Sequence, residues 1–75
     1  FMNTRLLALR TDRKLSQTAI AHCLNCSQRM YSRYERGEVD MPLSILVDAA
    51  RYYNISTDYL LNLTDIPNAY PSNER

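Results

Sequence analysis

Two apolar patterns with the same spacing follow one another in the middle of this chain, ten residues apart. Each has apolar residues at positions i, i+1 and i+4, which are Ile20, Ala21 and Leu24 in the first and Met30, Tyr31 and Tyr34 in the second. This spacing places each set along one side of an α-helix. Because the segment between the patterns is too short for a loop, the two helices must cross steeply if both apolar sides are to face one small core.

The residues that flank the two patterns supply the boundaries of such helices. Ser16 and Ser27 precede the patterns, where a serine side chain can accept a hydrogen bond from a free amide of the first helical turn. Asn25 lies in the turn, which needs one residue with a positive φ angle, and asparagine is the non-glycine residue that tolerates it best. These residues predict a helix-turn-helix motif, whose second helix runs from Ser27 to Glu35.

Further helices are predicted on both sides of this motif. A first helix of two to three turns, within 4–14, carries the apolar residues Leu6, Leu7 and Leu9. Gly37 suits the left-handed position that ends the third helix, and an acidic connector follows at 38–41.

The last two predicted helices follow this connector. Pro42 and Ser44 open a fourth helix and Asn54 can close it. Its apolar residues recur with helical spacing and are Leu43, Leu46, Val47, Ala50 and Tyr53. Ser56 and Thr57 offer a cap for a short fifth helix, whose apolar residues are Tyr59, Leu60 and Leu63.

Length and composition favour a single all-α domain. A chain of 75 residues has room for one domain, and one glycine with three prolines favours helices over a turn-rich sheet. We expect the domain at 4–65. Residues 1–3 are interpreted as a cloning remnant and lead-in, because Phe1 precedes Met2. Residues 66–75 contain two prolines and no periodicity, so they are expected to form a loosely ordered tail.

The net charge of +1 conceals an asymmetry along the chain. Residues 1–37 contain seven basic and two acidic residues, whereas residues 38–75 contain two basic and six acidic residues. A basic half of +5 beside an acidic half of −4 is typical of a domain with one face turned toward a polyanion. Chance clustering of charges remains the alternative interpretation of this feature taken alone.

Three motifs in order give the chain a resemblance to a known family. LSQ at 15–17, SRYERG at 32–37 and NISTDYLL at 54–61 resemble the XRE, or lambda-repressor-like (Cro/C1-type), helix-turn-helix domain of bacterial and phage repressors. The resemblance covers nearly everything from Leu6 to Asp65. It implies a compact five-helix lambda-repressor-like bundle, with the helix-turn-helix formed by the second and third helices. It also implies sequence-specific binding of double-stranded DNA by a small transcriptional repressor that reads the major groove with its third helix.

The resemblance further implies which residues read bases. Gln28, Arg29 and Arg33 are expected to face base edges, because positions 29 and 33 are one turn apart and position 28 lies at the end that enters the groove first. Arginine suits guanine and glutamine suits adenine, so a site containing G and A near the helix start is expected.

A second set of residues is expected to contact the DNA backbone, and it comprises Gln17, Ser27, Ser32, Arg36, Lys14 and Arg13. Gln17 is expected both to bond a phosphate and to brace the third helix. The connector departs from the family pattern, because Glu38 and Asp40 stand where basic residues are common and repel phosphates. Anchoring is therefore expected to rest more on Arg5, Arg13, Lys14 and Arg36.

Two further expectations concern a salt bridge, which the resemblance implies, and a dimer. Arg10 and Glu35 correspond to a pair that commonly forms a partly buried salt bridge between the first and third helices, so we interpret them as structural residues. A homodimer, at least on DNA, is expected on a palindromic operator, because a half-site read by three side chains gives few contacts.

Other functions find less support in the residues. Cys23 and Cys26 beside His22 suggest zinc or disulfide chemistry, but a second ligand pair is missing, so no metal site is expected. No catalytic constellation or glycine-rich phosphate loop is visible, and we expect neither an enzyme nor a cofactor. The alternative is a protein-interaction module on the same fold, such as an antitoxin or anti-repressor.

No segment predicts insertion into a membrane. The longest apolar run covers only residues 6–9, which is far shorter than a membrane span or the core of a signal peptide. We therefore expect no membrane partner and a cytoplasmic location.

Overall fold

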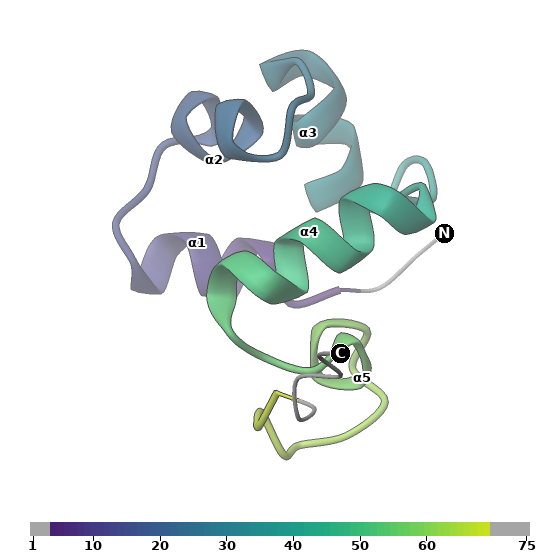
Figure 1. The fold of residues 1–75 in the computed structure, drawn as a ribbon. Coiled ribbons are helices and arrows are strands. Elements are labelled where there is room, and N and C mark those ends of the chain that lie inside the picture. Colours follow the sequence, from purple (N-terminus) through teal and green to yellow (C-terminus); the bar gives the residue numbers. More distant parts are fainter. Residues whose placement is uncertain (1–3, 70–75) are drawn as a thin grey trace, which may run out of the picture.

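The computed structural model describes residues 4–69, and the predicted all-α class is confirmed for them. The helices are α1 (Leu6–Asp12), α2 (Gln17–Cys23), α3 (Gln28–Glu35), α4 (Leu43–Tyr53) and α5 (Thr57–Leu60). In Figure 1, α2 and α3 lie at one end of the molecule and α5 lies at the other. Within this part of the chain there is no strand, only an isolated antiparallel bridge between Ile55 and Asn68. None of the described helices is long and apolar enough to cross a membrane.

Three serine caps begin helices where the sequence predicts them. The side chains of Ser16, Ser27 and Ser56 accept hydrogen bonds from the third amide that follows each of them, at 3.0 to 3.1 Å. Each serine satisfies one amide that the first helical turn leaves without a partner, which is worth about 1 kcal/mol. The local sequence therefore sets the starting points of α2, α3 and α5.

Positive φ angles close the turns between helices. Asn25 (φ 57°) and Gly37 (φ 74°) adopt the left-handed conformation, as predicted for a turn and a helix end. Asn54, predicted to close the fourth helix, ends α4 in the same conformation (φ 56°). Lys14 (φ 56°) and Asn62 (φ 64°) do so as well, without being foreseen. Lys14 lies in the tight turn between α1 and α2, where its amide donates to the Thr11 carbonyl. The compactness of this turn therefore forces a residue with a Cβ atom into an unfavourable region.

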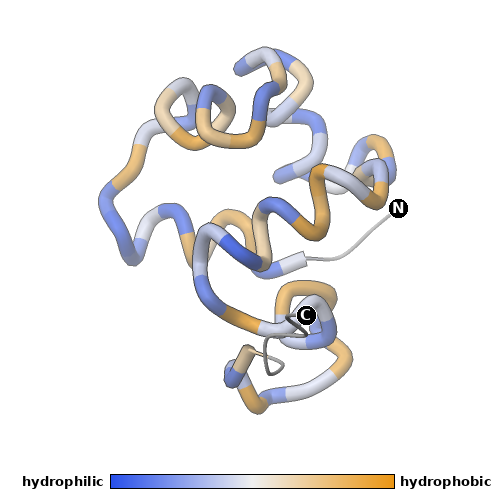
Figure 2. The backbone as a smooth tube through the Cα atoms, viewed as in Figure 1, coloured by the Kyte–Doolittle hydropathy of each residue, from blue (hydrophilic) through white to orange (hydrophobic). Residues whose placement is uncertain are grey.

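One hydrophobic core joins the five helices. Its most buried large side chains are Leu6, Ile20, Leu24, Tyr31 and Leu60. In Figure 2 the hydrophobic side of α2 faces the centre of the molecule. Ile20, Ala21, Leu24, Tyr31 and Tyr34, the residues predicted to fill the space between α2 and α3, are all buried. Met41, which the sequence places in the acidic connector, is also buried and anchors that connector to the core.

Three apolar residues predicted on buried stripes are exposed instead. Met30 is 37%, Leu43 74% and Leu63 71% exposed. Met30 lies at the edge of the stripe that Tyr31 and Tyr34 fill. Leu43 is the first residue of α4, and Leu63 follows the end of α5, so neither is enclosed by neighbouring helices. Helical spacing alone does not show how far a neighbouring element extends over a stripe.

Arg5, the residue directly before α1, binds α5 and the segment that follows it. The Arg5 guanidinium donates to the Tyr59 carbonyl at 2.7 Å and to the Thr64 carbonyl at 3.1 Å, and its charge lies 3.2 Å from Asp65. Further on, the Ser56 amide donates to the Pro67 carbonyl at 3.2 Å. The start of the segment expected to be a loose tail is thus hydrogen-bonded to the start of α5, whereas 1–3 and 70–75 lie outside the described residues.

Candidate nucleic-acid interface

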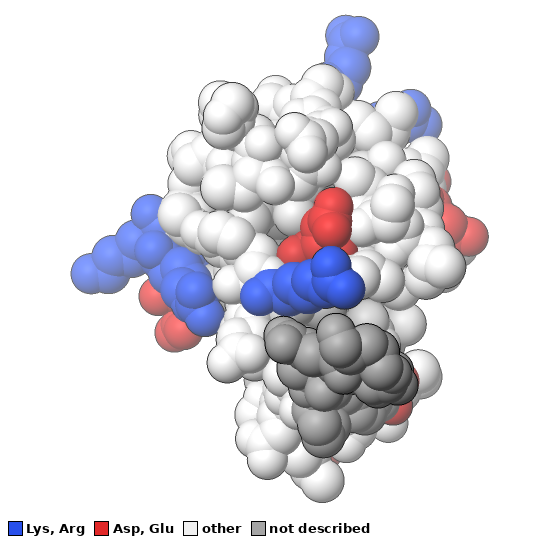
Figure 3. Space-filling model, in the orientation of Figure 1, with Lys and Arg blue, Asp and Glu red and all other residues white. Residues whose placement is uncertain are grey.

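The outer side of α3 is polar and basic. Tyr31 and Tyr34 turn inward, which leaves Gln28, Arg29 and Arg33 exposed on the other side. Arg36 is exposed directly after the helix, and Ser32 is half-buried. In Figure 3 basic side chains project from the end of the molecule where α2 and α3 lie, at the top of the view. The structure therefore brings all three predicted base-contacting residues to one exposed helical surface.

Gln17 links the start of α2 to both ends of α3. Its Nε2 donates to Glu35 Oε1 at 3.1 Å, and its Oε1 accepts from Gln28 Nε2 at 2.6 Å. The glutamine expected to brace the third helix is thus bonded to both its first and its last residue. This bond uses one of the two Nε2 protons of Gln28. The second Nε2 proton and the Oε1 atom of Gln28 form no other hydrogen bond within residues 4–69.

A buried ion pair connects α1 to α3. Arg10 Nε and Nη2 donate to the two Glu35 carboxylate oxygens at 2.7 and 3.1 Å, and Arg10 Nη1 donates to the Leu15 carbonyl at 2.9 Å. The two side chains are only 16% and 5% exposed. Burial by itself raises the pKa of Glu35, but the hydrogen bonds from Arg10 and Gln17 outweigh it and hold the pKa below its ordinary value. The pair expected between these helices is therefore present and ionised.

Two buried tyrosines surround this ion pair. Burial, together with the Glu35 carboxylate, raises the pKa of Tyr31 far above its ordinary value. Burial raises the pKa of Tyr53 to about 12. Neither hydroxyl has a hydrogen-bond partner of good geometry within the described residues. Both tyrosines are therefore neutral core residues, and their rings are not available for stacking on nucleic acid.

The remaining basic residues differ in their availability. Arg13 follows α1, and its guanidinium donates to the Tyr53 carbonyl at 3.3 Å and lies 5.4 Å from the centre of the Tyr53 ring. Arg5 stacks on Tyr59 at 4.1 Å and faces α5. Lys14 is exposed in the turn before α2. The structure thus commits Arg5 to contacts within the protein and ties Arg13 to the end of α4.

Glu38 folds back onto the last turn of α3. The positive φ angle of Gly37 allows the Glu38 amide to donate to the Arg33 carbonyl at 2.9 Å, which is a common way of ending a helix. Its carboxylate oxygens then lie 3.5 Å from Arg33 Nε and 3.1 Å from Arg36 Nε. The sequence predicted repulsion between Glu38 and phosphates but not these two ion pairs. The glycine one position before the glutamate was the available signal.

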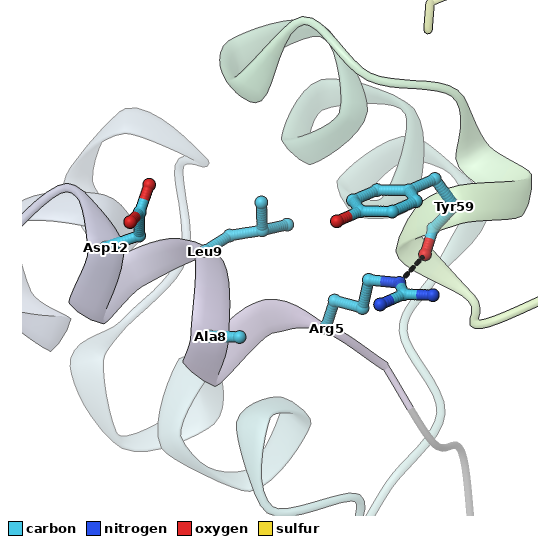
Figure 4. Close-up of a pocket in the computed structure, with 5 residues that line it drawn as sticks. All are labelled: Arg5, Ala8, Leu9, Asp12 and Tyr59. Atoms are coloured by element: carbon cyan, nitrogen blue, oxygen red, sulfur yellow. Dashed lines mark hydrogen bonds between the residues drawn. The ribbon is translucent and has the colours of Figure 1, made fainter. Parts of the chain in front are cut away.

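Two other features do not belong to the outer side of α3. A hollow of about 320 Å³ between α1 and α5 is lined by Arg5, Ala8, Leu9, Asp12 and Tyr59 (Figure 4). Cys23 is exposed and Cys26 is half-buried, both are free thiols, and burial raises the pKa of Cys26. Residues 4–69 contain no group of three or more potential metal ligands.

Comparison with known proteins identifies the family of this domain. The profile of the family described as "Helix-turn-helix" matches residues 6–60. The "Uncharacterized HTH-type transcriptional regulator YobD" of Bacillus subtilis (strain 168) is 40% identical over 63 residues, which are 84% of this chain and 56% of that protein. The chain therefore spans little more than half the length of this relative. No solved structure matches the chain significantly.

Proposed function

Because the chain belongs to the helix-turn-helix family, we propose that it is a DNA-binding transcription regulator and acts as a repressor. In this proposal α3 enters the major groove of duplex DNA with its N-terminal end first. A small domain of this kind represses by occupying its operator. A cytoplasmic location is part of the same proposal.

The observation that carries the proposal is the division of α3 into two sides. Its inner side is filled by tyrosines. Its outer side presents the exposed Gln28 and Arg29 in the first turn and the exposed Arg33 in the last turn. A helix that binds another protein usually presents aromatic or aliphatic anchors. On α3 the only such exposed residue is Met30, at 37%. This composition supports contacts with nucleic acid over the antitoxin or anti-repressor alternative.

The proposed contacts fall into two groups. Gln28, Arg29 and Arg33 read base edges, since glutamine pairs two-fold with adenine and arginine with guanine. The backbone is held by Gln17, Ser27, Ser32, Arg36, Lys14 and Arg13. Among these, Gln17 and Ser27 stand at the starts of α2 and α3, where free amides and the helix dipole favour a phosphate.

We include a homodimer on a palindromic operator in the proposal. Two copies related by a two-fold axis place their recognition helices roughly 34 Å apart, which is one turn of DNA. The contact surface proposed for this dimer is α5 and the segment that follows it. There, Leu63 is 71% and Ile66 64% exposed, and apolar side chains of this kind are stabilised by burial against a second copy.

Selection of bound duplexes from a random pool tests the function. A recovered palindrome with G and A near each half-site start supports sequence-specific binding by a dimer. Arg29→Ala is expected to weaken binding of the recovered duplex by about 10- to 100-fold and to relax the preference at one base pair. Lys14→Ala, which removes an exposed charge in the turn before α2, is expected to weaken recovered and random duplexes by similar factors. No enrichment of any sequence overturns the proposal and favours the protein-interaction alternative.

A further inference from the structure

Glu38 occupies an unusual position for an acidic residue beside a DNA-reading helix. Its carboxylate lies between Arg33, proposed to read a base, and Arg36, proposed to hold the backbone. The three side chains are about half exposed, at 44%, 58% and 44% for Arg33, Arg36 and Glu38. The ion pairs therefore lie on the proposed interface and not in the core.

Both arginines meet Glu38 through the same atom of the guanidinium. The printed contacts of the Glu38 carboxylate are with Nε, at 3.5 Å from Arg33 Nε and 3.1 Å from Arg36 Nε. A guanidinium has five N–H donors in a fixed plane, and only two are needed for the two-fold pairing with guanine. Arg33 can consequently read a guanine while its Nε stays with Glu38.

The same carboxylate opposes contacts that carry no sequence information. Binding to a random duplex depends on neutralising phosphates with Lys and Arg and on releasing their counterions. Glu38 already offsets the charges of Arg33 and Arg36, and its own charge repels any phosphate that approaches them. This repulsion lowers the affinity for every duplex, whereas the orientation of Arg33 raises the affinity only for a duplex that has a guanine at the position facing Arg33.

We propose that Glu38 is a specificity-determining residue, which holds Arg33 and Arg36 by their Nε atoms and so lowers affinity for random DNA more than affinity for the operator. The inference rests on the proposed DNA-binding function. It assigns a role to an acidic connector that otherwise only weakens the basic surface.

The test compares Glu38→Gln with a matched control. Asp40→Asn removes one negative charge from the same connector, and Asp40 is exposed and forms no ion pair within residues 4–69. Dissociation constants are measured for the duplex recovered by selection and for a random duplex of equal length, by fluorescence anisotropy from about 50 to 200 mM salt. Urea unfolding of both variants checks that they are folded, which the exposure of both residues favours.

Glu38→Gln is expected to tighten binding of the random duplex by about 3- to 30-fold, because two exposed ion pairs no longer compete with phosphates. Its salt dependence is expected to steepen by about one unit of log affinity per unit of log salt. Binding of the recovered duplex is expected to change by a smaller factor, so that the ratio of the two affinities falls about 3-fold or more in Glu38→Gln and stays unchanged in Asp40→Asn.

The outcomes separate this inference from the proposed function. If both variants shift the two affinities equally, only net charge matters and the role of Glu38 is overturned, while the DNA-binding function stands. If the unmodified chain selects no sequence, the proposed function fails and the inference fails with it.

Discussion

Removing one partner of the Arg10–Glu35 pair is expected to destabilise the fold far more than removing both. Arg10→Met leaves a carboxylate that is only 5% exposed, with the Gln17 amide and the nearby Tyr31 hydroxyl as its remaining polar contacts. Loss of one partner of a buried pair costs about 3 to 5 kcal/mol. Because the Arg10 side chain is itself 16% exposed, water can partly replace it, and we expect about 3 kcal/mol at neutral pH. A domain of this size has a total stability of roughly 4 to 11 kcal/mol, so much of it is lost.

The double variant Arg10→Met with Glu35→Met isolates the pair. Two apolar side chains of similar volume leave no uncompensated charge, and such replacements are often neutral or stabilising. Urea unfolding of the unmodified protein, Arg10→Met, Glu35→Met and the double variant gives the four free energies of unfolding for a double-mutant cycle. We expect a coupling of about 2 kcal/mol or more. A coupling below about 0.5 kcal/mol, which is typical of an exposed pair, refutes this reasoning.

The pH dependence supplies an independent check on the same pair. The pKa of Glu35 is held below its ordinary value, so its contribution to stability is fully present above that ordinary value, about 4.3, and is lost as pH falls through the folded-state pKa. In Arg10→Met, burial is no longer outweighed and raises the pKa of Glu35. The folded variant then binds a proton more tightly than the unfolded chain, and its stability rises as pH falls. The difference in free energy of unfolding between the unmodified protein and Arg10→Met should therefore become smaller from pH about 7 to about 4. A difference that stays constant over this range contradicts the conclusion that Arg10 holds the pKa of Glu35 low.

Three other substitutions test single features by urea unfolding. Asn25→Val should cost about 1 kcal/mol or more, because a β-branched residue disfavours φ 57°, whereas Asn25→Gly should be neutral or mildly stabilising; equal effects contradict this. Lys14→Gly should stabilise the fold by up to about 1 kcal/mol, since it relieves φ 56°, and a loss of stability counts against that explanation. Tyr53→Phe should be neutral or stabilising by up to about 1 kcal/mol, because it removes a buried hydroxyl without a partner; a clear loss indicates an unseen hydrogen bond.

The sequence could predict the features of the fold that are decided within a few residues. A cap requires only a serine and the amides that follow it, as at Ser16 and Ser27. A left-handed turn requires a residue that tolerates it, as at Asn25. The pairing of Arg10 with Glu35 depends instead on how α1 and α3 pack, and it was available only from the family resemblance.

Features that depend on the course of the connector could not be predicted in the same way. Met41 is buried because the connector between α3 and α4 packs against the core, which no local pattern encodes. The turn at Gly37 brings Glu38 back to α3, but its ion pairs depend in addition on where the side chains of Arg33 and Arg36 lie. For the candidate site, the sequence therefore predicted which residues lie on α3 but not which charges they meet there.

The ionised state of Glu35 also determines which way the side-chain amide of Gln28, on the proposed DNA-reading surface, is turned. A carboxylate only accepts hydrogen bonds, so Gln17 must turn its Nε2 group toward Glu35. Its Oε1 then faces Gln28, which must answer with its own Nε2 group. The second Nε2 proton and the oxygen of Gln28 are left for a partner, and these are the donor and acceptor that an adenine edge requires. An ion pair that ties α1 to α3 thereby sets the polarity of a side chain at the surface, through two glutamine amides that could otherwise point either way.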